Sequence, residues 1–327
     1  MLHHPRRLPQ LEGGLFLSDG GLETTLIFLE GIELPHFAAF DLLREPSGRA
    51  VLHKYYARYA AIARDSKMGF ILESPTWRSS PEWGAKLGYS MDDLDVINRA
   101  AIKLMLDLRE EYATADAPMV VSGVVGPRGD GYDPGQIMTA AEAATYHAPQ
   151  IASMAVAGAE LITATTMTNV PEAIGIARAA QAAGLPSVVS FTLETDGRLP
   201  TSQSLGQAIS EVDAATGPSD TNGAPAYYMI NCAHPTHFAD MLHAAERAGA
   251  AWVKRVRGLR ANASKRSHQE LNEAPDLDAG NPAELGREYA ALRRRHPQIN
   301  VLGGCCGTDH RHLEQIGTSC GNPAKAA

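Results

Sequence analysis

Short apolar runs rich in β-branched residues alternate with longer segments of helical periodicity along the whole chain. The apolar runs predict eight strands, at residues 13–19, 69–74, 118–124, 160–166, 187–193, 227–232, 250–256 and 299–304. The segments between them predict seven helices, at residues 50–66, 91–113, 140–157, 171–183, 203–215, 236–248 and 282–295. This alternation is typical of a parallel sheet with helical crossovers.

Glycines stand where several helical patterns give way to the next strand, at Gly69, Gly158, Gly184 and Gly249. Glycine is favoured at these C-terminal caps. Eight strand-helix units favour a closed barrel over an open doubly wound sheet, and no G-x-G-x-x-G motif follows the first strand. We therefore predict a single-domain α/β protein with a (β/α)8 TIM barrel, a fold that needs about 250 residues.

The predicted barrel spans residues 13–317, between an N-terminal extension at residues 1–12 and a C-terminal tail at residues 318–327. The tail has no periodic pattern, so we expect it to be frayed. Residues 261–280 are rich in turn formers and charge, and predict a long loop after the seventh strand.

Composition narrows the class of protein. The chain is 44% hydrophobic and 20% charged, as in globular proteins, and its net charge of −8 argues against a nucleic-acid partner. It has no apolar run of about 20 residues and no signal-peptide pattern. We therefore predict a cytoplasmic protein without a membrane partner, and leave an oligomer possible. Cysteines that cluster in a reducing compartment serve metals or catalysis more often than disulfides.

The stretch VLGGCCGTDH places two of the four cysteines side by side, as Cys305 and Cys306. In a barrel, the carboxyl ends of the strands face the active site. Six polar or ionisable side chains fall at that end: Asp19, Glu73, Thr165, Cys232, Cys305 and Cys306. Three cysteines that meet there would suit Zn²⁺, which prefers soft thiolate ligands. The alternative is that each cysteine is a small buried hydrophobic residue.

Three motifs resemble the homocysteine S-methyltransferase family, the zinc-dependent thiol methyltransferases. They are DGGLETTL at residues 19–26, Asn231-Cys232 at the end of the sixth strand and GGCCGT at residues 303–308. The resemblance covers nearly the whole chain in the right order. It implies a (β/α)8 barrel in which Cys232, Cys305 and Cys306 bind Zn²⁺ and the homocysteine sulfur takes the fourth position. Cys320 lies outside these motifs.

The same resemblance implies substrate contacts at Asp19, Gly20 and Asn231. The barrel leaves no room for a cobalamin or folate domain, so the methyl donor is expected to be a small onium compound such as S-methylmethionine, S-adenosylmethionine or a betaine. Aromatic faces would stabilise its positive charge. The aromatic candidates in the loops are Trp77, Trp83, Phe37 and Phe40.

The chain departs from the family at two strand ends. Thr165 stands where the family commonly has an acid that holds the substrate amino group, and Glu73 stands where an uncharged residue is usual. We predict that Thr165 still lines the site and that Glu73 takes over the amine-holding role. The alternative is that Glu73 pairs with Arg78 or Lys86 as loop scaffolding.

Other polar residues have structural interpretations. His234 and His237, like Asp309 and His310, are predicted to start helices rather than to bind metal. The basic run KRVRGLR is interpreted as a solvated or salt-bridged face. Two rival functions remain: a barrel lyase or isomerase with a phosphate site after the eighth strand, and a non-catalytic zinc-thiolate module.

Overall fold

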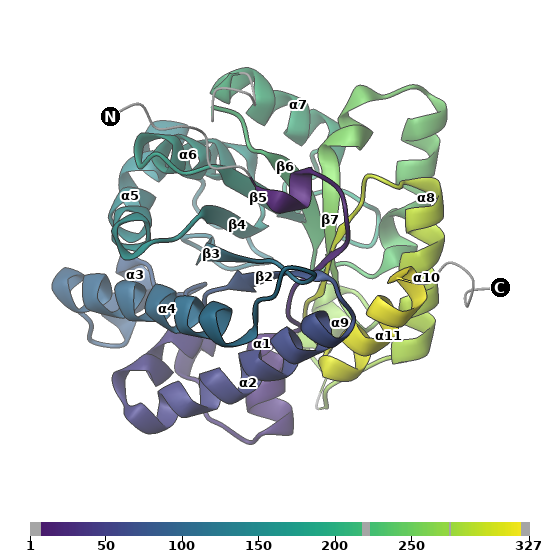
Figure 1. Ribbon diagram of the computed structural model, residues 1–327. Coiled ribbons are helices and arrows are strands. Elements are labelled where there is room, and N and C mark those ends of the chain that lie inside the picture. The colour runs from purple at the N-terminus through teal and green to yellow at the C-terminus, as the bar shows by residue number, and fades with distance from the viewer. Residues whose placement is uncertain (1–7, 218–222, 275, 322–327) are drawn as a thin grey trace.

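The computed structural model describes residues 8–217, 223–274 and 276–321. Eight parallel strands pair in chain order, and β1 pairs with β8 to close the barrel (Figure 1). Their bounds are β1 Phe16–Leu17, β2 Gly69–Glu73, β3 Met119–Val125, β4 Leu161–Met167, β5 Ser187–Thr192, β6 Tyr227–Asn231, β7 Val256–Ala261 and β8 Val301–Gly304. The predicted (β/α)8 fold is confirmed.

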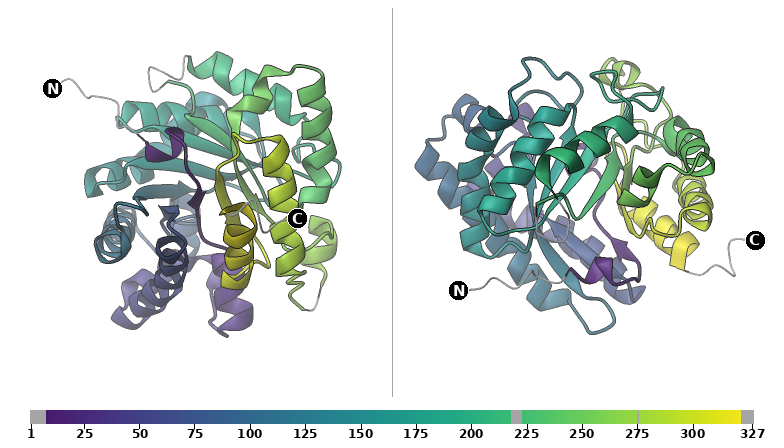
Figure 2. Two further views of the ribbon diagram at one scale, coloured as in Figure 1. Left: turned by 45° about the vertical axis from the view of Figure 1, so that its right-hand side comes forward. Right: turned by 90° about the horizontal axis from the view of Figure 1, so that it is seen from above.

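Helices surround the barrel on its outside (Figure 2). The long ones are α2 Pro46–Asp65, α4 Met91–Tyr112, α5 Ala140–Ala157, α6 Val170–Ala182, α7 Leu205–Thr216, α8 Pro235–Arg247, α10 Pro282–Arg295 and α11 His310–Gly321. The shorter ones are α1 Leu22–Thr24, which continues as a π-helix over Thr25–Leu29, α3 Pro81–Lys86 and α9 His268–Asn272. Polar residues such as Ser90 and Thr139 fix several helix starts through capping boxes. All seven predicted helices are present, with their ends displaced by a few residues at most.

The seventh strand lies further along the chain than predicted. Residues Ala251–Arg255 form a 3₁₀-helix, and β7 is Val256–Ala261. The strand contains two arginines, Arg257 and Arg260, which break the apolar pattern used to find strands. Both have specific partners: Arg257 donates to Gln10 O, and Arg260 pairs with Asp19.

The chain after β7 is more ordered than the predicted loop at 261–280, because α9 lies within it. The predicted frayed tail is also wrong for residues 318–321, since α11 continues to Gly321. This helix buries Leu313, Ile316 and Cys320 on one face, at a spacing of three and four residues. The boundary at 317 therefore falls inside a helix, and residues 322–327 lie outside the described part of the chain.

Two apolar clusters place the core. One fills the space between the strands and the helices, and the other lies around the first residues of the strands, including Phe16, Ile71 and Val120. Leu8 packs on this second cluster, and the main-chain oxygen of Gln10 accepts a 2.8 Å hydrogen bond from Asn300. The described residues of the N-terminal extension thus cover the end of the barrel opposite the carboxyl ends of the strands.

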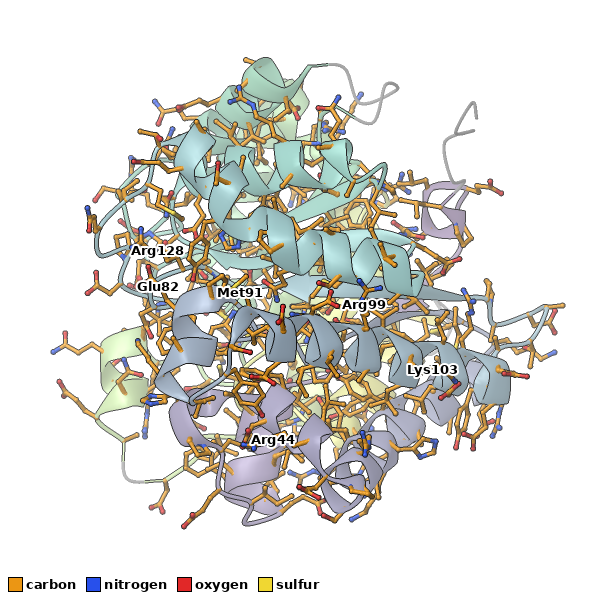
Figure 3. All side chains as sticks on the ribbon, turned by 90° about the vertical axis from the view of Figure 1, so that its left-hand side faces the viewer. Arg44, Glu82, Met91, Arg99, Lys103 and Arg128 are labelled. Atoms are coloured by element: carbon orange, nitrogen blue, oxygen red, sulfur yellow. The ribbon has the colours of Figure 1, made fainter. Side chains whose placement is uncertain are left out.

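Loops at the carboxyl ends of the strands are held by polar contacts. Figure 3 shows Arg128, after β3, beside Glu82 of α3, and Arg128 Nε donates to Glu82 Oε1 at 2.7 Å. Across the described residues, no helix combines the length and apolar character needed to cross a bilayer.

Candidate active site

Three cysteine thiols meet at the carboxyl ends of β6 and β8. Cys232 follows β6, and Cys305 and Cys306 follow β8. Their Sγ atoms all lie within 4.8 Å of one another, and those of Cys232 and Cys305 are 2.7 Å apart. Cys232 is buried and has a left-handed backbone conformation with φ of 57°, which is rare for a residue with a side chain. The geometry confirms that residues 73 positions apart in sequence share one site.

The glycine-rich motifs position this cysteine loop by packing against each other. The Gly21 N–H donates to Thr308 O at 3.0 Å, and a Cβ built on Gly21 would lie 2.6 Å from Cys305 O. Thr308 Oγ1 donates to the same Cys305 oxygen at 2.7 Å. Gly307 has φ of 79°, which a side chain would strain. DGG and GGCCGT therefore form one structural unit.

Polar groups surround the sulfur atoms. Asn231 Nδ2 donates to Cys232 Sγ at 3.0 Å, and Asn231 Oδ1 accepts from Ser190 Oγ at 2.7 Å. Because the amide oxygen is occupied by a donor, the Asn231 amide group is oriented with its N–H toward the sulfur. Asn231 thus reaches the site, as predicted, through a ligand candidate.

Tyr132 lies over the cysteines and was not found by sequence reasoning. Its hydroxyl is 3.3 Å from Cys306 Sγ, and its ring stacks on His268 at 4.0 Å between centroids. Hydrogen bonds from Cys232, Cys305 and Tyr132 hold the pKa of Cys306 well below its usual value. Burial raises the pKa of Cys232 instead. Of these two thiols, Cys306 is therefore the one at which the thiolate form is favoured.

A buried ion cluster connects β1, β2 and β7 beside the cysteines. Arg260 Nη1 donates to Asp19 Oδ1 at 2.7 Å and also contacts Glu73 Oε2. Tyr55 donates to the other Asp19 oxygen at 3.1 Å. Burial raises the pKa of Glu73, while Arg260 opposes that effect. Two acidic side chains therefore share one guanidinium.

The ion-pair partner of Glu73 differs from the two that the sequence suggested. Arg78 pairs with Asp130 at 3.3 Å, and the Lys86 ammonium lies 3.6 Å from the centre of the Trp83 ring. Arg260, which belongs to the basic run interpreted as a surface face, is 11% exposed in its side chain. Arg260 forms ion pairs with Asp19 after β1 and with Glu73 on β2. A local sequence pattern cannot predict contacts between residues so far apart in the chain.

Glu23 is a second acid that sequence reasoning passed over. It lies on α1, between Gly21 and Thr24, and is half-buried. Burial raises its pKa to about 7, and the neighbouring charges of Cys306 and Asp19 add to that effect.

Gly20 follows β1 and Thr165 lies near the end of β4, and their contacts with a substrate stay predictions. A Cβ on Gly20 would meet Thr308 O at 2.9 Å, so this glycine is required for close packing. Gly20 O also accepts from Tyr55 at 3.1 Å. Thr165 is partly exposed near the end of β4, next to Thr166, whose φ is 57°.

The four aromatic candidates divide into three environments. Phe40 is fully buried in the core, and Phe37 is 47% exposed. The guanidinium carbon of Arg78 lies 4.0 Å from the centre of the Trp77 ring and 3.5 Å from that of Trp83. Both tryptophan rings therefore already contact a cation of the protein itself, the Arg78 guanidinium.

The remaining sequence candidates are structural. His234 caps α8, and Asp309 Oδ1 accepts from the Arg311 N–H at the start of α11, as predicted. Cys320 is buried on α11 and does not belong to the cluster of three thiols.

A model of the homocysteine S-methyltransferase family matches residues 16–320. The chain belongs to the homocysteine S-methyltransferase family. It is therefore a methyltransferase, and the resemblance stated from its motifs is confirmed. No curated protein sequence matches the chain.

The structure is similar to that of the Escherichia coli homocysteine methyltransferase MmuM. The oxidised form aligns with a TM-score of 0.72 and 19% identity, over 97% of this chain and 99% of that chain. The metallated form aligns with a TM-score of 0.71 and 19% identity, over 96% of this chain and 99% of that chain. These alignments support the barrel fold of this homocysteine S-methyltransferase family member.

Proposed function

We propose that this protein is a zinc-dependent S-methyltransferase. It moves a methyl group from a small onium donor, such as S-methylmethionine, S-adenosylmethionine or a betaine, to the thiol of homocysteine or a related acceptor, and yields methionine or an analogue. The observation that carries this proposal is the convergence of three cysteine Sγ atoms within 4.8 Å at the mouth of the barrel.

The donor set fits Zn²⁺. Thiolates are its preferred soft ligands, and three protein ligands leave one tetrahedral position for a substrate. Zinc bound there would hold the acceptor sulfur in its thiolate form. Among the described residues, no histidine or carboxylate joins the three thiols in a metal-binding group. This favours an open catalytic site over a closed storage module.

The surrounding residues would support transfer to a thiolate. The sulfur of the acceptor forms a bond to the methyl carbon while the bond from that carbon to the onium centre breaks, and the electron pair of that bond leaves with the donor. Positive charge on the donor is therefore neutralised as negative charge on the acceptor is consumed. Asn231 holds Cys232 in place through its N–H.

The acceptor would lie between β1, β2 and β4. In this proposal Asp19 and Gly20 border its polar end, and the hydroxyl of Thr165 lines the opposite side. Glu73 contributes to binding of the amino group through the charge of the cluster, because Arg260 already occupies one of its oxygens. This refines the amine-holding role that the sequence assigned to Glu73.

Metal analysis combined with a donor screen tests the proposal. Purified protein should contain about one zinc per chain, and mass spectrometry should detect methionine when homocysteine is mixed with one of the onium donors. Cys320→Ser should match the wild type in both measurements. Tight phosphate binding without metal would favour a lyase or isomerase, and bound zinc without turnover of any thiol would favour a non-catalytic module.

A further inference from the structure

Glu23 is a carboxylate at the mouth of the barrel to which the proposed function gives no role. In the described part of the chain its carboxylate has no hydrogen bond or ion pair with another residue. The acids near it differ in this respect, since Asp19 is bonded to Arg260 and Tyr55, and Glu73 to Arg260. Among the described residues, Glu23 is therefore the acid of this group whose carboxylate has no partner from another residue, although its own main-chain N–H donates to it.

The neighbours of Glu23 in sequence hold it against the cysteine loop. On one side, the Gly21 N–H donates to Thr308 O at 3.0 Å. On the other side, Thr24 Oγ1 accepts from the Gly307 N–H at 3.2 Å and donates to Gly21 O at 3.2 Å. These bonds fix the single turn that carries Glu23 beside the residues that follow Cys306.

A carboxylate held near other negative groups requires a cation. The charges of Cys306 and Asp19 act on Glu23, as do two guanidinium groups. Both guanidinium groups have ion-pair partners already: Arg260 is shared between Asp19 and Glu73, and Arg78 pairs with Asp130. An unpaired, partly buried carboxylate costs free energy that a bound cation would recover. The arrangement therefore points to a ligand that brings its own positive charge.

We infer that Glu23 binds the ammonium group of the acceptor, so that the site selects a thiol that also carries an amine. This inference rests on the proposed function. An ammonium donates three hydrogen bonds and so satisfies a carboxylate with free acceptor capacity, whereas the sulfonium or quaternary ammonium centre that gives up the methyl group has no N–H to donate. Glu23 would then supply the acid that the chain lacks at Thr165.

Calorimetry on zinc-loaded protein tests this assignment with two thiols. Homocysteine carries the amino group, and 4-mercaptobutanoate is the same molecule without it. Glu23→Gln should weaken homocysteine binding by about tenfold or more, because a charge-assisted hydrogen bond is lost, and should leave binding of 4-mercaptobutanoate unchanged. Glu33→Gln, an exposed acid in the same segment, should bind both thiols as the wild type does.

Several outcomes would overturn the inference. One is a Glu23→Gln variant that retains wild-type zinc content and melting temperature but binds both thiols with equally reduced affinity, or both with unchanged affinity. Another is a variant whose homocysteine affinity is unchanged while the KM of the methyl donor rises, since Glu23 would then bind the donor instead of the acceptor. Wild-type protein that binds neither thiol would instead contradict the proposed function itself, and this inference with it.

Discussion

The three clustered cysteines differ in their hydrogen bonds, and this difference assigns them separate roles in metal binding. Cys306 receives hydrogen bonds that lower its pKa, and Cys232 is fully buried with a single amide donor from Asn231. A metal ion would therefore displace a proton more readily from Cys306 than from Cys232. Metal affinity should rise with pH for this reason.

Replacing Cys306 by serine should remove most of the bound zinc and the methyl transfer activity. Serine keeps the size of the side chain but does not supply the soft thiolate that zinc prefers. Metal content by mass spectrometry and melting by circular dichroism check this together, and the melting temperature should stay close to that of the metal-free wild type. Cys320→Ser is the matched control. A Cys306→Ser protein with full zinc and full rate would contradict the ligand assignment.

Glu23 should make the stability of the metal-free protein depend on pH. Its pKa is about 7 when folded, because of burial, against 4.5 in the unfolded chain. Between these values the folded state keeps a proton that the unfolded state has lost, so stability falls as pH rises. Asp19, Cys306 and Arg260 face this group, and each is retained when Glu23 alone is changed.

Melting temperatures of wild type and Glu23→Gln at pH 5 and pH 8 measure that effect. The two proteins should melt together at pH 5, and the variant should be the more stable at pH 8. Glu33→Gln should have the melting temperature of the wild type at both pH values. Equal melting of wild type and Glu23→Gln at pH 8 would show that Glu23 is solvated in the folded protein.

Strand β7 contributes Arg260, whose side chain forms ion pairs with residues at two other strand ends. Arg260 connects this strand to Asp19 after β1 and to Glu73 at the end of β2, although β7 pairs only with β6 and β8. The arginine therefore spans the barrel mouth and fixes the relative position of three strand ends.

Arg260→Met should destabilise the protein by about 3 to 5 kcal/mol near neutral pH, because two buried carboxylates lose their common partner. The loss should be smaller at pH 5, because burial raises the pKa of Glu73 and protonation of Glu73 relieves the repulsion. Urea unfolding at both pH values measures it. Arg257→Met on the same strand is the control, with a pH-independent effect, since Arg257 bonds to a main-chain oxygen and to Asn300. A pH-independent loss for Arg260→Met would show that the carboxylates do not depend on it.

Element prediction succeeded where side-chain patterns are local. Strands β2 to β6 and β8 are runs of mainly apolar and β-branched residues without an internal charge, and helix starts such as Ser90 have recognisable caps. The seventh strand was predicted too early in the chain because Arg260 interrupts its apolar pattern. The partners of Arg260 lie more than 180 residues away in sequence. Tyr132 was missed for the same reason, since its contact with Cys306 joins positions 174 residues apart.

In the whole molecule, the residues that stabilise the barrel and the residues of the candidate active site lie in different places. The apolar clusters lie between strands and helices and around the first residues of the strands, whereas the cysteines follow the last residues of β6 and β8. The motifs DGG, NC and GGCCGT were informative from the sequence because each supplies its residues at a strand end, where closure of the barrel brings them together. What the sequence could not provide was the set of partners that closure adds, such as Arg260 for Glu73.

Removing the metal should leave the barrel folded. The apolar clusters formed by the described residues include none of the three clustered cysteines, so chelation should preserve the far-UV circular dichroism spectrum and a cooperative melting transition. Zinc should raise the melting temperature only through its binding free energy, by an amount that grows with free zinc concentration. A Cys232→Ser, Cys305→Ser, Cys306→Ser triple variant should melt at the temperature of the chelated wild type and should not respond to added zinc. Loss of the far-UV spectrum on chelation of the wild type would contradict this, and would identify the ion as a structural element of the fold.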